Sequence, residues 1–110
     1  MKNILIAIIF FLGWNQLHAQ TNPAIALADK IALKMKDTLA LSDSQKTQIY
    51  DLNMQLHHEK MLMRQQFAGN VVLREKMQAV ENTRDSLYRS VLTEPQFILY
   101  RQKKRTLVGN

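Results

Sequence analysis

The residues best suited to chemistry lie in one short stretch that contains Met54, His57, His58, Glu59 and Met61. His57 and Met61 are four residues apart, so on a helix both can contact one ion. Histidine with methionine suits a soft ion such as Cu(I), whereas histidine with glutamate suits zinc. Adjacent histidines on a helix point about 100° apart, so His57 and His58 cannot bind one ion within a single chain. We expect a solvated or interfacial histidine pair and no cofactor; a zinc or copper site shared between two chains is the alternative.

Other catalytic patterns are missing from the sequence. After residue 19 the only glycines are Gly69 and Gly109, so a glycine-rich phosphate-binding loop cannot form. The chain has no cysteine, which removes thiol nucleophiles and disulfides. No serine lies in a Gly-x-Ser-x-Gly turn. We therefore expect a protein that acts by binding and is not an enzyme.

The first residues have the features of an export signal. Lys2 precedes an apolar run, and Leu17-His18-Ala19 resembles a small-residue cleavage site. Ile4 to Trp14 contains 11 residues without a charge, whereas a membrane-spanning helix needs about 20. We expect residues 1–19 to be a signal peptide, residues 20–110 to form one domain, and the protein to be periplasmic. A retained membrane anchor is the alternative.

The expected mature chain is basic. Removing Lys2 leaves 14 of the 15 lysines and arginines against nine acidic residues, a formal charge of +5. Inside a cell this balance would suggest nucleic acid, but export argues against such a partner. Anionic lipid headgroups, acidic polymers and acidic proteins remain as partners. Alternatively, the charge only keeps a helical surface soluble.

Caps and apolar spacing predict four helices. Asn22-Pro23 is a favourable helix start, and apolar residues then recur every four positions. The second helix is expected from Ser42 to Phe67, because Gly69-Asn70 is a strong stop signal. A third helix follows, and the last runs from Glu94 to about Arg105. The residues expected on the inner faces are Leu27, Ile31, Met35 and Leu39; Ile49, Leu52, Leu56, Met63 and Phe67; and Leu73, Met77, Val80, Leu87 and Val91.

Two side-chain groups do not fit a simple hairpin interface. Arg84 falls within the apolar stripe of the third helix, where its stem can pack while the guanidinium reaches solvent or an acidic partner. The second helix carries another stripe, about 130° from the first. Helix one, a second subunit or a client protein could cover it. This expected client or dimer surface consists of Tyr50, Met54, His57 and Met61.

The same short motif begins two of these helices. The first copy is Leu41-Ser42-x-x-Gln45, and the second is Leu92-Thr93-x-x-Gln96, 51 positions later. Each is a capping box: the hydroxyl accepts from the N–H of the glutamine, whose side chain accepts from the N–H of the cap residue.

The doubled motif and the helix order resemble the LTXXQ-motif periplasmic proteins, the Spy/CpxP-like family, over nearly all of residues 22–105. The first copy departs from the pattern by having Ser42 in place of threonine, and the hairpin between the copies is shorter than usual. The resemblance implies an all-α, elongated four-helix protomer with a long central hairpin, paired into an antiparallel, cradle-like homodimer. It also implies an ATP-independent chaperone or envelope-stress protein that binds unfolded or misfolded clients. The alternative that it implies is a heavy-metal stress sensor or signalling accessory, partnered by a membrane sensor protein.

Overall fold

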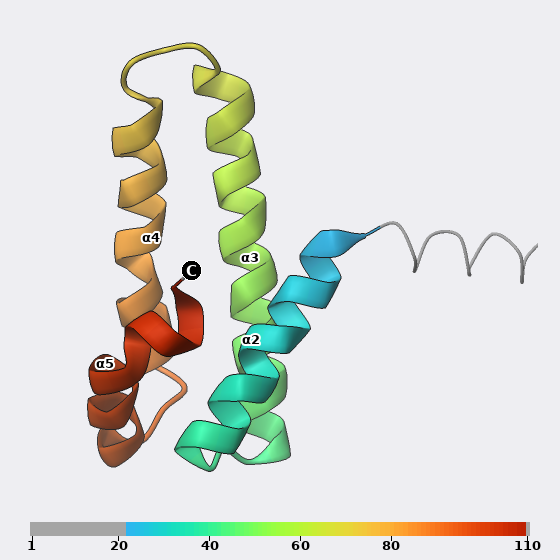
Figure 1. Ribbon diagram of the computed structural model, residues 1–110, viewed down its shortest axis with the longest axis vertical. Coiled ribbons are helices and arrows are strands. Elements are labelled where there is room, and N and C mark those ends of the chain that lie inside the picture. Colours follow the sequence, from blue (N-terminus) through green and yellow to red (C-terminus); the bar gives the residue numbers. More distant parts are fainter. Residues whose placement is uncertain (1–21, 110) are drawn as a thin grey trace, which may run out of the picture.

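The computed structural model describes residues 22–109, of which 84% are helical, and no strand occurs among them. The helices are α2 (Pro23–Leu39), α3 (Asp43–Phe67), α4 (Leu73–Arg89) and α5 (Glu94–Val108) (Figure 1). The predicted all-α class and the four helices are confirmed. The expected signal peptide, residues 1–19, lies outside the described residues.

A long hairpin of α3 and α4 forms the frame of the molecule (Figure 1). Helix α2 packs across the half of α3 that is nearest the open end of the hairpin, and α5 folds back beside α4 and α2. The four helices pack into one compact unit. The connections from α2 to α3 and from α4 to α5 therefore lie at the same end.

The helix starts follow the predicted capping chemistry. The Asn22 side chain accepts hydrogen bonds from the amides of Ala24 and Ile25, and Pro23 occupies the first turn of α2. Both α3 and α5 begin with a complete capping box. Gly69 ends the α3 turn with φ of 75°, a left-handed conformation that glycine adopts without a Cβ clash.

Two helix ends differ from the sequence prediction. Helix α4 ends at Arg89, so Val91 lies in the connection and not on the helix. The chain makes one more turn there, in which the amides of Val91 and Leu92 both donate to the carbonyl of Tyr88, at 2.9 and 3.0 Å. Helix α5 continues to Val108, three residues beyond the expected end.

The core lies where all four helices meet, near the open end of the hairpin. One prediction for its composition is wrong: Leu27 is 53% exposed, and Ala28 is buried instead. Small side chains at Ala28 and Ala32 let α2 approach α3 closely, so the neighbouring leucine turns outward. The buried cluster consists of Ala32, Met35, Leu39, Leu41, Ile49, Tyr88, Leu92, Phe97, Tyr100 and Leu107.

Candidate functional site

The two motif copies contact each other at the open end of the hairpin. The Gln45 side-chain amide donates to the Gln96 carbonyl oxygen at 2.8 Å, and the Gln96 amide donates back to Gln45 at 3.3 Å. Leu41 and Leu92, the first residues of the copies, are both buried in the core. The repeated motif thus forms one junction with approximate twofold character.

Each glutamine also holds its own helix start and the opposite connection. The Gln45 Oε1 accepts from the Ser42 amide at 3.0 Å, and the Gln96 Oε1 accepts from the Thr93 amide at 2.9 Å. The Gln45 Nε2 also donates to the Val91 carbonyl at 3.1 Å, in the connection before α5. The Gln96 Nε2 donates to two carbonyls before α3, those of Leu39 and Ala40. The sequence predicted the two caps, but it gave no signal that the caps would meet.

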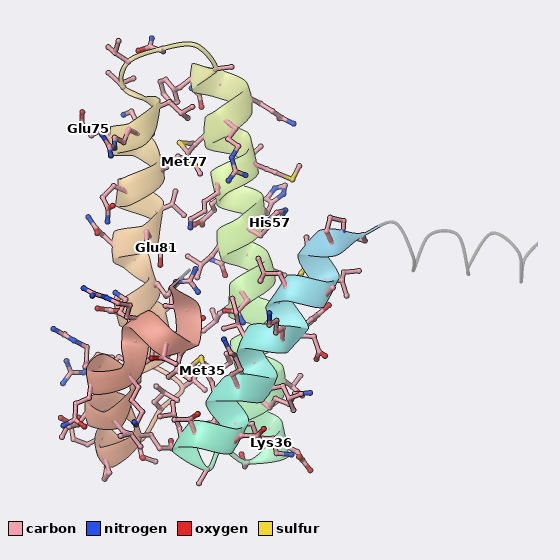
Figure 2. The ribbon with its side chains drawn as sticks, viewed as in Figure 1. Met35, Lys36, His57, Glu75, Met77 and Glu81 are labelled. Carbon is pink, nitrogen blue, oxygen red and sulfur yellow. The ribbon has the colours of Figure 1, made fainter. Side chains whose placement is uncertain are left out.

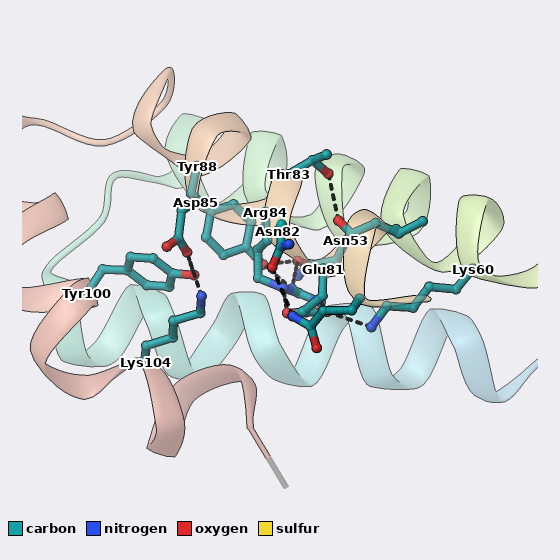
Figure 3. A network of polar contacts seen from close by, with 12 residues as sticks. Asn53, Lys60, Glu81, Asn82, Thr83, Arg84, Asp85, Tyr88, Tyr100 and Lys104 are labelled. Carbon is teal, nitrogen blue, oxygen red and sulfur yellow. Dashed lines mark hydrogen bonds and ion pairs between the residues drawn. The ribbon is translucent and has the colours of Figure 1, made fainter. Parts of the chain in front are cut away.

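A second polar cluster surrounds the buried guanidinium of Arg84 (Figure 3). Arg84 is 7% exposed, and its Nε and Nη2 donate to the two carboxylate oxygens of Glu81 at 2.6 and 3.2 Å. Its Nη1 donates to the Tyr88 hydroxyl at 2.8 Å. The sequence predicted that this guanidinium reaches solvent or an acidic partner, and Glu81 is that partner.

This Arg84 cluster joins three helices. Asn53 of α3 accepts a hydrogen bond from the Tyr88 hydroxyl and donates to the Ala28 carbonyl of α2 at 3.1 Å. Lys60 of α3 donates to Glu81 of α4 at 2.6 Å. Among residues 22–109, every buried side-chain nitrogen and oxygen has a hydrogen-bond partner. The cluster is therefore a satisfied network across α2, α3 and α4.

The electrostatics of the network favour its charged state. Burial acts to raise the pKa of Glu81, but the hydrogen bonds and charges of Arg84 and Lys60 outweigh it and lower the pKa to about 2. Burial also acts against the charge of Arg84, yet the carboxylate of Glu81 raises the arginine pKa above its ordinary value. Burial raises the pKa of Tyr88 to about 12, so this hydroxyl remains a donor to Asn53 at neutral pH.

A smaller cluster joins α4 to α5. The Tyr100 hydroxyl donates to Asp85 at 2.8 Å, and Lys104 forms an ion pair with the same carboxylate oxygen at 2.8 Å (Figure 3). Burial acts to raise the pKa of Asp85, but the hydrogen bonds from Lys104 and Tyr100 lower it below its ordinary value. Burial and the adjacent Asp85 raise the pKa of Tyr100. The Tyr88 and Tyr100 rings pack edge to face, with centroids 5.2 Å apart, which connects the two clusters.

The predicted second face of α3 is covered only in part. Tyr50 packs against the core and, together with Ile25 and Asp29 of α2, lines a small pocket. Met54 is half-buried and Met61 is 40% exposed. Contact within the chain therefore accounts for the Tyr50 end of the stripe and leaves the Met61 end open.

The two adjacent histidines, His57 and His58, differ in their exposure to solvent. His57 is half-buried, on the side of α3 away from α4 (Figure 2), whereas His58 is exposed. Within residues 22–109, no group of three or more His, Cys, Asp or Glu side chains is arranged to hold a metal ion. In the same residues, no helix is both long and apolar enough to cross a membrane.

No protein-family model matches the chain, and no curated protein or solved structure gives a significant match. The resemblance to the LTXXQ-motif proteins therefore stays a prediction from the two motif copies and the helix order.

The first prediction concerns the charge of Glu81. The folded-state pKa of about 2 lies below the ordinary value of 4.5, so the ionised carboxylate stabilises the fold above about pH 4.5, and this contribution disappears as the pH falls towards 2. We expect Glu81→Gln to lower the free energy of unfolding at pH 7 by about 3 kcal/mol. Urea denaturation at several pH values measures the difference, which should shrink steadily below pH 4.5.

The matched control for this experiment is Glu75→Gln, on the same helix. Glu75 is exposed and lies on the outer side of α4, whereas Glu81 faces α3 (Figure 2). This control should change stability by less than about 0.5 kcal/mol. Equal losses in the two variants, or a Glu81→Gln loss that does not depend on pH, would contradict the assignment of the network.

The second prediction concerns the junction of the two motifs. In a double-mutant cycle, Gln45→Ala and Gln96→Ala should each destabilise the protein, because each removes a cap contact and contacts to the other motif. The double variant should lose less than the sum, with a coupling of about 1 kcal/mol for the shared hydrogen bonds. Pairing Gln45→Ala with Gln48→Ala is the control, since Gln48 bonds only to Ser44 in the described contacts. If the losses of unfolding free energy for Gln45→Ala and Gln96→Ala are additive, the proposed hydrogen bonds between the two motifs are contradicted.

Proposed function

We propose that the protein is an ATP-independent envelope chaperone that holds partly unfolded clients. The observation that carries this proposal is the number of large apolar side chains left in solvent on a small, basic protein. On α2, Ile25, Leu27 and Leu33 are 39–53% exposed. On α3, Met61 and Leu62 are 40% and 44% exposed.

Exposed apolar residues are ordinary when they are scattered, so the proposal requires that those of α2 and α3 act as contact surfaces for a partner. Met61 adds a flexible thioether, which adapts to partners of different shape. The positive charge of the chain would accelerate encounters with acidic or weakly structured polypeptides. Capture followed by loose apolar contact is the behaviour expected of a holding chaperone. The resemblance to the LTXXQ-motif proteins supports the same function.

The periplasm is the proposed location, with residues 1–19 acting as the export signal. The proposed assembly is a cradle-like homodimer. The polar junction and the Arg84 network support this arrangement, because they hold four helices in fixed positions without consuming the outer apolar faces of α2 and α3. Those faces remain available for a second copy and for clients.

The third prediction concerns client protection. We expect Met61→Glu with Leu62→Glu to weaken protection of an aggregating client several-fold, because the change places charge on an exposed apolar surface. Light scattering of a thermally unfolding client at near-stoichiometric ratios measures the effect. Gln65→Glu with Gln66→Glu is the control, since it adds the same charge to exposed polar positions on α3. The proposal fails if the protein gives no protection, and the surface is misassigned if both variants protect equally.

The fourth prediction concerns the oligomeric state. Burying the exposed α2 leucines in a second copy should give a dimer at tens of micromolar. Sedimentation velocity should show about twice the protomer mass, and Leu27→Lys with Leu33→Lys should shift the protein towards monomer. A stable monomer of the unaltered protein at this concentration would remove the dimer.

A further inference from the structure

A large groove lies between α2, α3 and α5, and two α4 side chains, Glu81 and Arg84, also line it. Its volume is about 1320 Å³, which is larger than the roughly 300–1000 Å³ of ordinary small-molecule sites. His57 lies in its wall, and the apolar side chains of Ile31 and Leu107 form part of its lining. The space suits a ligand with several charged groups.

The groove gathers the positive charge of the protein. Eight lysines and arginines line it against a single carboxylate, that of Glu81. Outside the groove, residues 22–109 carry six cationic and eight acidic side chains. The excess charge is therefore concentrated in one concave surface, which a purely solubilising role does not require.

Part of this charge is already neutralised. Among the described residues, Lys60 and Arg84 pair with Glu81, and Lys104 pairs with Asp85. The remaining groove cations form no ion pair with a carboxylate of residues 22–109; they are Lys30, Lys34, Arg64, Arg101 and Arg105. These five cations come from three helices, so a bound anion would meet them from several sides.

We propose that this groove binds a multiply phosphorylated ligand, either a soluble polyphosphate or the phosphate-bearing headgroup of a lipid. A phosphate monoester carries nearly two negative charges and three acceptor oxygens, whereas a carboxylate carries one charge and two oxygens. Arginine presents a planar fork that binds phosphate through two parallel hydrogen bonds. An extended acidic peptide presents side chains on one face only every second residue, about 6.8 Å apart, and fits convergent charges less well. This inference does not require the client-holding function, although Leu27, which the proposed dimer would bury, also lines the groove.

The experiment titrates the protein with tripolyphosphate and, separately, with vesicles containing a phosphatidylinositol bisphosphate or only phosphatidylcholine. Lys30→Gln with Arg105→Gln should weaken binding about tenfold and make its salt dependence shallower, because two phosphate contacts are lost. Arg74→Gln with Lys103→Gln is the matched control: it removes one lysine and one arginine, both exposed and both outside the groove. This control should bind within about twofold of the unaltered protein, since its charges lie off the site.

The outcomes separate the two ligand sources. Binding of tripolyphosphate with the expected variant pattern supports a soluble ligand, and the same pattern with phosphatidylinositol bisphosphate vesicles alone supports a lipid headgroup. Polyglutamate of matched charge that binds equally well would overturn the preference for phosphate and indicate an acidic peptide. No binding, or equal losses in the groove and control variants, would overturn the site. Amide NMR shifts in the unaltered protein provide a measurement without variants: they should centre on Lys30 and Arg105 and spare Arg74.

Discussion

The reciprocal hydrogen bonds between Gln45 and Gln96 are the constraint on which the remaining arrangement depends. They join the connection between α2 and α3 to the connection between α4 and α5, two segments that are 51 residues apart in the sequence. The carbonyl oxygens of the same two side chains complete the capping boxes. Their amide groups also donate to Val91 and Leu39, so the start of each helix is tied to the connection that precedes the other helix. Gln45 and Gln96, which mark helix starts in the sequence, thus also form a tertiary contact with each other.

The Arg84 network stabilises a different region by different means. An arginine that is 7% exposed loses most of its hydration. Burying this charge would destabilise the fold without the bidentate contact to Glu81 and the hydrogen bond to the Tyr88 hydroxyl. Asn53 extends this arrangement to the backbone of α2 through the Ala28 carbonyl. The junction fixes the ends of the helices, and the network fixes how α2 and α4 are placed along α3.

Local chemistry was sufficient to predict the helices and their caps. Asn22, Ser42 and Thr93 act on amides within three residues, so their role follows from short-range sequence. The crossing of α2 over α3 does not follow in this way, because apolar spacing defines a face without saying which small residues permit close approach. That is why Leu27 was expected inside and Ala28 is buried. Asn53 and Tyr88 were missed for a related reason: a single polar residue or tyrosine in a helix gives no sign of its distant partners.

The placement of α5 beside α2 also creates the basic groove, since these two helices supply four of its five cations without an acidic partner among residues 22–109. The relative positions of α2 and α5, and with them the groove, depend on the hydrogen bonds between Gln45 and Gln96 persisting in solution. Hydrogen exchange of their side-chain carboxamide protons, followed by NMR on the unaltered protein, tests this most directly. The account predicts slowed exchange for Gln45 and Gln96 relative to the exposed Gln65. Exchange as fast as that of Gln65 at both positions would contradict it.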